Sequence, residues 1–280
     1  MEGVRQFLVV RDGLRMKSLE RHESGGVEFF GSPLLDELGF LRHGFSTRWG
    51  GVSEGRFRSL NLGRARGEAP ENVAENRKRF FGAADFPAGR LVEAKQVHGC
   101  DVIVAERVSP GERTCGDALI TNASGLGVAV QTADCIPVLI ADARKMAVAA
   151  VHAGRKGVAG GVLPAAIERM KEEYGCDPRD MRAALGPAIS GARYEVGEEC
   201  LPPFRERHRN WRDFATPLGG GKWLLDLPLA ARLQLASAGI PESRIGAPGP
   251  CTFCESSRFF SYRRDGRPTG RLLSAIWIGA

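Results

Sequence analysis

The chain has few histidines and no long apolar run. Its 280 residues include five histidines and three tyrosines, and no apolar stretch approaches the roughly 18 residues of a membrane span. No internal repeat or low-complexity tract is present, so we expect a compact chain throughout. Residues 1–5 also lack the basic segment and apolar core of a secretory signal. These absences predict a cytoplasmic protein with no membrane partner.

Disulfide frameworks and nucleic-acid motifs are also missing. The seven cysteines are an odd number, and in a reducing compartment a functional thiol is expected to be a metal ligand or a nucleophile. The net charge of +6 is moderate, and the arginine-rich stretches 205–212 and 263–271 accompany no nucleic-acid-binding motif. We therefore expect no nucleic-acid partner, but an anionic small-molecule substrate. The oligomeric state leaves no trace in the sequence.

Apolar runs and helical periodicity predict an α+β fold. Short runs rich in Val, Ile and Ala predict strands, and apolar residues at helical spacing predict helices. The expected strands are Arg90–Ala94, Val128–Gln131, Ile136–Ala141, Met146–His152, Phe259–Arg263 and Leu272–Ile278, and the expected helices are Ala69–Phe81, Val158–Tyr174 and Leu227–Ala238. Because strands and helices mix without a steady βαβ rhythm, we expect a single domain of mixed β-sheets covered by helices.

Two of the five histidines and one cysteine lie at the ends of expected strands. His98 follows one strand, His152 ends another, and Cys135 stands at the mouth of a third. Two imidazoles and a thiolate suit Zn²⁺, and three protein ligands leave the fourth position open, as in catalytic zinc sites. By composition alone, a buried cysteine with two hydrogen-bonded histidines is the commoner arrangement. The residues by themselves leave both interpretations open.

A series of motifs in a fixed order resembles a known family. The motifs are Arg48-Trp49-Gly50-Gly51-Val52-Ser53, Ser59-Leu60-Asn61-Leu62-Gly63, Gln96-Val97-His98-Gly99, Gly116-Asp117-Ala118-Leu119-Ile120-Thr121, Thr132-Ala133-Asp134-Cys135-Ile136-Pro137, Ala150-Val151-His152-Ala153-Gly154, Gly186-Pro187-Ala188-Ile189, Tyr194-Glu195-Val196-Gly197, Cys251-Thr252 and Phe260-Ser261-Tyr262-Arg263-Arg264. Together they resemble the laccase-domain, or polyphenol oxidase, family, whose members are also called purine nucleoside phosphorylases and, in bacteria, peptidoglycan editing factors. The resemblance divides the chain into residues 1–30, an extension of unclear role, and the family domain, 31–280.

The resemblance implies the site and the fold. The family's zinc ligands correspond to His98, Cys135 and His152, which would be both metal-binding and catalytic, on a laccase-domain or cysteine-hydrolase-like fold. Copper would be an adventitious occupant of the same site. One departure concerns the family's His-Ala-Gly-Trp-Arg-Gly motif, which has Arg155-Lys156 at the Trp-Arg position. A positive charge remains there, but the aromatic ring is gone.

The implied activity is phosphorolysis of adenosine, inosine and S-methyl-5′-thioadenosine, with adenosine deamination as a second activity. Its partners would be a purine nucleoside and phosphate. We expect Asp117 and Asp134 to act as hydrogen-bond partners of a ligating histidine. The expected substrate contacts are Arg48, Lys156 and Arg263 for the anion, Asn61 and Gln96 for sugar or base, and Phe260 or Tyr262 for stacking on the base.

Several alternatives remain open or are excluded. The same three residues fit a metal-free Cys–His hydrolase, an amidase that removes L-Ser from UDP-MurNAc-L-Ser, or a non-catalytic zinc-binding protein. A multicopper laccase is excluded, because five histidines without a His-X-His pair cannot hold its copper ions. A cytidine-deaminase-like site is excluded too, since its Glu and Cys-X-X-Cys pattern is absent beside these ligands. For the pair Cys251 and Cys254 we expect a structural or buried role rather than a redox disulfide.

Overall fold

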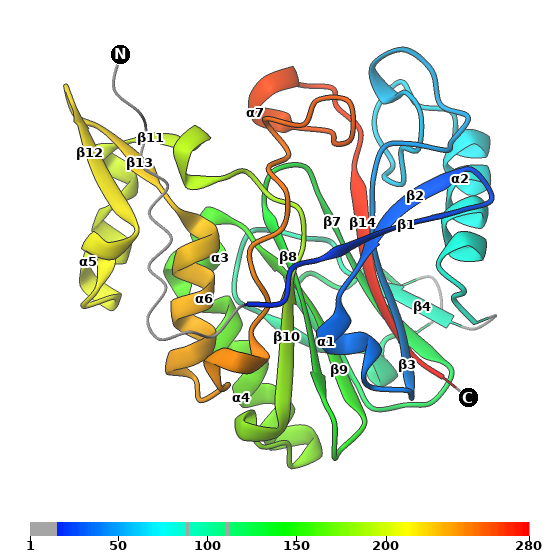
Figure 1. Cartoon of the computed structure of the whole chain (residues 1–280), viewed down its shortest axis with the longest axis horizontal. Coiled ribbons are helices and arrows are strands. Elements are labelled where there is room, and N and C mark those ends of the chain that lie inside the picture. Colours follow the sequence, from blue (N-terminus) through cyan, green and yellow to red (C-terminus); the bar gives the residue numbers. More distant parts are fainter. Residues whose placement is uncertain (1–15, 88–89, 110–111, 280) are drawn as a thin grey trace.

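Two β-sheets packed face to face form the body of the protein. The computed structural model describes residues 16–87, 90–109 and 112–279 (Figure 1). The larger sheet has six strands, in the order β1 (Glu20–Ser24), β2 (Val27–Gly31), β3 (Leu41–Ser46), β14 (Leu272–Ile278), β7 (Leu126–Thr132) and β4 (Arg90–Glu93). The second has five, in the order β10 (Met181–Leu185), β8 (Ile136–Asp142), β9 (Ala147–Ala153), β6 (Ala118–Thr121) and β5 (Val102–Val104).

Both sheets are mixed. Their strands are antiparallel except for the pairs β4–β7 and β5–β6, which are parallel. The C-terminal strand β14 lies between β3 and β7, with Ala275 opposite Gly44 on one side and Ala129 on the other. The last segment of the chain therefore ties the N-terminal strands to the centre of the molecule.

The strands beside the candidate centre are buried on both faces. In β9, Val148 and Ala150 face the apolar layer between the two sheets, while Ala149 and Val151 face the helices. Such a strand has a continuous apolar sequence because water reaches neither face. Strands β7 and β14 of one sheet pack on β8 and β9 of the other. This double burial gives the ends of β8 and β9 a rigid support.

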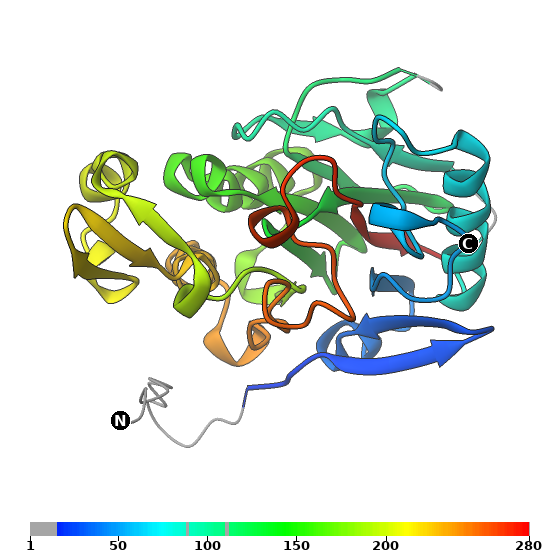
Figure 2. The ribbon, with the colours of Figure 1, turned by 90° about the horizontal axis from the view of Figure 1, so that it is seen from above.

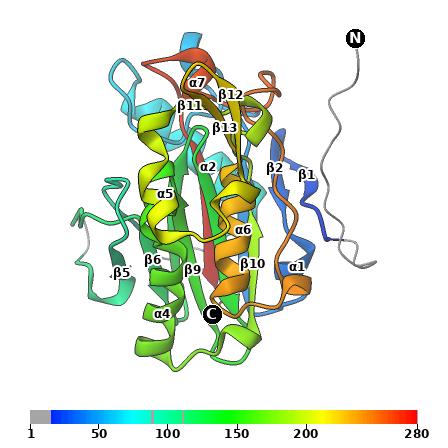
Figure 3. The same cartoon turned by 90° about the vertical axis from the view of Figure 1, so that its left-hand side faces the viewer.

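Helices cover the outer faces of the two sheets (Figure 3). Helix α4 packs on β9 and β6, and α2 packs on β2 at the opposite face. The α-helices are α1 (Pro33–Asp36), α2 (Pro70–Ala83), α3 (Arg155–Gly160), α4 (Val162–Tyr174), α5 (Pro202–Arg207), α6 (Leu227–Ser237) and α7 (Tyr262–Asp265). A small third sheet of β11 (Glu195–Gly197), β13 (Lys222–Leu225) and β12 (Ala215–Gly219) stands with α5 at one end of the molecule (Figure 2). Among the described residues, no helix is both long and apolar enough to cross a membrane.

The predicted α+β class, with mixed sheets covered by helices, is confirmed. The predicted strand Leu272–Ile278 is observed with the same bounds, and the helix predicted from residue 158 is interrupted at Gly161, where φ is +89°. The predicted strand Phe259–Arg263 is wrong. Its two phenylalanines are buried without strand pairing, and Ser261 caps the short helix α7 by accepting a hydrogen bond from the Arg264 N–H. The apolar pattern there reflects burial in a loop.

Candidate metal centre

His98, Cys135 and His152 come together where β8 begins and β9 ends. Their ligand atoms all lie within 4.8 Å of one another, and this group could hold a metal ion. His98 Nε2 lies 4.0 Å from Cys135 Sγ, and the two imidazole rings are perpendicular with centroids 4.7 Å apart. Cys135 immediately precedes β8, and His152 is the penultimate residue of β9, opposite Pro137. The sheet register therefore fixes two of the three residues side by side.

Asp117 connects two of these residues. Its carboxylate is fully buried, and the Nδ1–H of His152 donates to Oδ1 at 2.7 Å. This bond fixes the imidazole so that Nε2 faces the group. The backbone N–H of His98 donates to the same oxygen at 2.9 Å, while those of Val97 and Gly99 donate to Oδ2 at 3.1 and 2.7 Å. Asp117 thus positions one ring directly and the other through its backbone.

The protonation states follow from these contacts. Desolvation raises the pKa of the Cys135 thiol, but hydrogen bonds from His152 and His98 outweigh it and lower the pKa to about 6. Desolvation lowers the pKa of His152, but Asp117 and Cys135 raise it to about 9. The pKa of Asp117 is lowered, since its hydrogen bonds from His152 and the backbone outweigh desolvation. Without a metal, the group favours a thiolate beside an imidazolium.

Strained backbone accompanies the site. His98 and Asp134 have φ values of +62° and +92°, in a region that L-residues other than glycine rarely adopt. Asp134 is held by its own carboxylate, which accepts the Thr252 hydroxyl and the Arg263 N–H, each at 2.6 Å. Asp134 was expected to partner a ligating histidine. Instead its carboxylate holds the two loops that carry Thr252 and Arg263.

A glycine leaves room for the group. A Cβ atom on Gly154 would lie 2.9 Å from His98 Cδ2 and 3.2 Å from Cys135 Sγ. Any larger residue there would push two of the three side chains apart. The glycine that follows His152-Ala153 is thus required by the site rather than by a turn.

The expected anion contacts lie at different places. Arg48 is half-buried, with its guanidinium 4.5 Å from the Phe260 ring and hydrogen bonds to the Arg58 and Ser256 carbonyls. Arg263 is exposed and lies over the Tyr194 ring at 4.9 Å. Lys156 is exposed, and the structure shows no hydrogen bond or ion pair for it within the described residues. Of the three expected anion contacts, Arg263 alone is hydrogen-bonded to the loop of Cys135 in the described structure, through its backbone N–H to Asp134.

Three expected substrate contacts have structural roles instead. Asn61 is fully buried, donating to Gly63 O and Glu68 Oε2 and accepting from Gly63 N and Arg271 N. Gln96 exchanges two hydrogen bonds of 2.8 Å with the backbone of Gln131. Phe260 is fully buried beneath Arg48, so it cannot stack on a base. The two side-chain amides are engaged in hydrogen bonds within the protein, and the Phe260 ring is packed in its interior. The alternative stacking residue, Tyr262, is 46% exposed.

Sequence reasoning missed three residues near the centre. Arg155 lies near the Tyr194 hydroxyl, and burial raises the pKa of that phenol despite this cation. Arg271 is half-buried. Burial lowers the pKa of its guanidinium, and the negative charges of Cys135 and Asp134 partly offset this shift. Tyr194 was visible in the Tyr-Glu-Val-Gly motif, whereas nothing in the local pattern of Arg271 marked it. Arg155 and Arg263 therefore lie near Tyr194, and Arg271 lies near Cys135.

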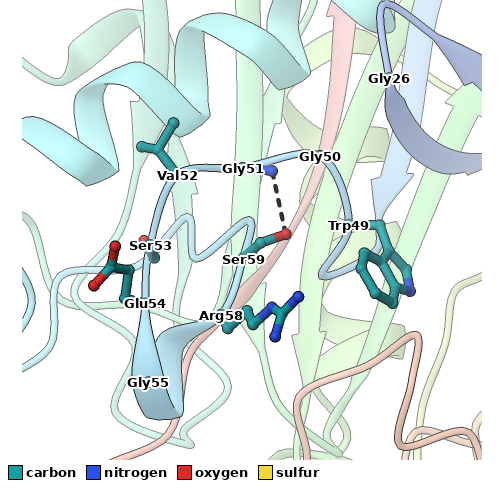
Figure 4. Close-up of a pocket in the computed structure, with 10 residues that line it drawn as sticks. All are labelled: Gly26, Trp49, Gly50, Gly51, Val52, Ser53, Glu54, Gly55, Arg58 and Ser59. Carbon is teal, nitrogen blue, oxygen red and sulfur yellow. Dashed lines mark hydrogen bonds between the residues drawn. The ribbon is translucent and has the colours of Figure 1, made fainter.

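A surface loop lines a separate, open pocket of about 630 Å³ (Figure 4). Residues 49–55 line it together with Gly26, Arg58 and Ser59, and the Gly51 N–H donates to Ser59 Oγ across the loop. Trp49 is 44% exposed at its edge. A neighbouring cavity of about 240 Å³ reaches Arg48 and Ser256. None of the three candidate ligands lines either cavity.

The chain matches known proteins over most of its length. A family model described as multi-copper polyphenol oxidoreductase laccase matches residues 42–279. A Streptomyces coelicolor protein named purine nucleoside phosphorylase SCO2081 is 39% identical over 87% of this chain and 98% of its own length. Purine nucleoside phosphorylase YfiH of Escherichia coli K12 is 40% identical over 83% of this chain and 92% of its own.

Solved structures of related proteins share the fold of this chain. The crystal structure of YlmD from Geobacillus stearothermophilus superimposes with a TM-score of 0.85 at 32% identity, covering 94% of this chain and all of that one. The Neisseria meningitidis protein NMB0706 gives a TM-score of 0.79 at 36% identity with the same coverage. The chain therefore belongs to the laccase-like family described as multi-copper polyphenol oxidoreductase laccases, and the relatives it resembles are named purine nucleoside phosphorylases.

Proposed function

We propose that this protein is a zinc-dependent purine nucleoside phosphorylase that uses His98, Cys135 and His152 as its metal ligands. The observation that carries the proposal is the convergence of two imidazoles and a thiol within 4.8 Å. The names of the relatives support the reaction class. We propose adenosine, inosine and S-methyl-5′-thioadenosine as substrates, with phosphate as the acceptor of the sugar, and adenosine deamination as a second activity.

The three residues fit zinc by chemistry and by distance. In a tetrahedral site with ordinary Zn–N and Zn–S bonds, an imidazole nitrogen and a thiolate sulfur lie about 3.6 Å apart. The 4.0 Å between His98 Nε2 and Cys135 Sγ needs only a small contraction. The lowered pKa of Cys135 matches the thiolate that a metal requires. Bound there, zinc would supply Lewis-acid polarisation of an oxygen atom.

The chain's own residues supply the remaining requirements. Phosphorolysis joins a phosphate oxygen to the anomeric carbon while the bond to the purine breaks, so the enzyme must hold a polyanion beside a developing positive charge on the sugar. Arg155, Arg263 and Arg271 offer guanidinium groups for the phosphate. Tyr194, with its hydroxyl toward Arg155 and its ring beneath Arg263, orients two of them. Tyr262, an exposed aromatic side chain two residues from Phe260, is available for the base.

The test is phosphate-dependent release of the free base from adenosine, inosine and S-methyl-5′-thioadenosine. Wild type is compared with Cys135→Ser and with Cys115→Ser, which removes an exposed cysteine distant in sequence from the ligands. We expect turnover that requires phosphate, is lost in Cys135→Ser and is unchanged in Cys115→Ser. Base release that continues without phosphate, or in Cys135→Ser, would contradict the proposal.

One observation favours a second candidate, a cysteine-dependent amidase that removes L-Ser from UDP-MurNAc-L-Ser. Asp117, His152 and Cys135 form a hydrogen-bonded series in which the carboxylate fixes the imidazole and the imidazole acidifies the thiol. This is the arrangement of a Cys–His–acid nucleophile system. Chelator treatment separates the two candidates. Amide cleavage in metal-free protein, with covalent trapping of Cys135, would replace the phosphorylase proposal.

A further inference from the structure

Outside the metal centre, Cys251 and Cys254 stand in one tight turn. The Glu255 N–H donates to the Cys251 carbonyl at 3.0 Å, which closes a single helical turn across both cysteines. In helical geometry, residues three apart have Cα atoms about 5 Å apart. This lies within the 4.4–6.8 Å that disulfides span. The turn therefore brings the two cysteines to a Cα spacing compatible with ring closure.

The two thiols differ in environment. Of the structural or buried role expected for this pair, the buried one does not apply to Cys254, which is exposed and lies against Arg193. Cys251 is half-buried, and the Ser190 N–H donates to its sulfur at 3.3 Å. Although desolvation opposes it, hydrogen bonding by the Ser190 side chain and backbone and by Cys254 lowers the pKa of the Cys251 thiol. By contrast, burial and nearby Asp142 raise the pKa of Cys176 to about 12, which leaves that thiol inert.

We propose that Cys251 and Cys254 are a redox-active dithiol that is converted to an intramolecular disulfide by a small-molecule disulfide. The thiolate of one cysteine attacks one sulfur of the reagent, forming a mixed disulfide and releasing one thiolate. The thiolate of the other cysteine then attacks the sulfur of the first, closing the ring and releasing the second thiolate. The two released thiolates take up the two protons that the cysteines lose. The protein loses two electrons, and the reagent gains them.

The dithiol lies next to the structure that supports the candidate centre. Thr252, between the two cysteines, donates its hydroxyl to Asp134, the residue before Cys135. The Ile189 N–H, adjacent to Ser190, donates to the Asp134 carbonyl at 3.0 Å. The residues on either side of the Cys251 sulfur contact, Thr252 in the turn and Ile189 beside Ser190, therefore both bind Asp134. A change in the redox state of the pair would therefore act on segments that hold the loop of Cys135.

The test follows one tryptic peptide, because residues 245–258 contain both cysteines and no internal Lys or Arg. Reduced protein is incubated with glutathione disulfide, quenched with acid, alkylated and analysed by mass spectrometry. We expect the peptide to lose both alkylatable thiols and two hydrogen atoms, and to regain them with dithiothreitol. The folded protein should close the ring at least tenfold faster than the urea-unfolded chain.

Variants identify the bond. Cys251→Ser and Cys254→Ser should each stop at a glutathione adduct on the remaining cysteine. Cys115→Ser, which removes another exposed thiol, should leave ring closure unchanged. Retention of both free thiols in wild type, glutathione adducts without ring closure, or equal rates in folded and unfolded chains would each overturn the proposal.

Discussion

Replacing Asp117 with Asn separates its geometry from its charge. The carboxylate accepts four hydrogen bonds, two on each oxygen, and an amide can accept on one side only. If the amide nitrogen replaces Oδ2, it faces the N–H groups of Val97 and Gly99, and each unsatisfied donor costs about 1–3 kcal/mol. If it replaces Oδ1, it donates to His152 Nδ1 and moves the ring proton to Nε2, where the metal ligand lone pair is needed.

Either arrangement weakens the centre. Loss of such a partner behind a ligating histidine lowers metal affinity by about 10–100-fold, which corresponds to about 1.4–2.8 kcal/mol. The assay is zinc competition with a chromophoric chelator, on Asp117→Asn and on Asp101→Asn, a control that removes an exposed carboxylate near the same loop. Wild-type zinc affinity in Asp117→Asn would refute the reasoning, and an equal loss in both variants would indicate a general charge effect.

Three further changes test the fold. Burial lowers the pKa of His43 to about 4. Between pH 4 and 6.5 the imidazole is therefore protonated in the unfolded chain but neutral in the folded one. About 3 kcal/mol of folding stability, present above pH 6.5, is lost as the pH falls to 4. Urea unfolding at several pH values should show a shallower dependence in His43→Gln. Gly127→Ala should destabilise by about 2 kcal/mol or more, because its Cβ would lie 2.3 Å from Trp277. Gly82→Ala, in a helix with free space around it, should stabilise by roughly 0.5–1 kcal/mol, and the two thermal midpoints should move in opposite directions.

The sequence predicted best where burial alone decides structure. Strands such as β9 and β14 are continuous apolar runs because both faces are buried, so composition predicted β14 with its observed bounds and β9 to within one residue at each end. The three candidate ligands stood at strand ends, and the sheet register brings two of them together. The pattern that failed, Phe259–Arg263, begins with two buried phenylalanines, but their burial comes from loop packing that local sequence does not reveal.

The substrate contacts could not be read from residue type. Asn61 and Gln96 have the side chains expected of sugar or base contacts, yet their hydrogen-bonding groups are occupied within the protein. Asn61 binds Gly63, Glu68 and the distant Arg271 N–H, and Gln96 binds the distant backbone of Gln131. Conversely, Arg271 comes near Cys135 only because β14 lies beside β7. Such roles depend on tertiary pairing, which no local motif encodes.

The most direct test of the central claim is zinc X-ray absorption of the purified protein beside Cys135→Ser. The account predicts one zinc per chain, with two nitrogen scatterers at about 2.0–2.1 Å, one sulfur at about 2.3 Å and a further light atom. In Cys135→Ser the sulfur shell should vanish with most of the metal. Wild-type protein without stoichiometric zinc, or zinc whose sulfur shell survives in Cys135→Ser, would contradict the account.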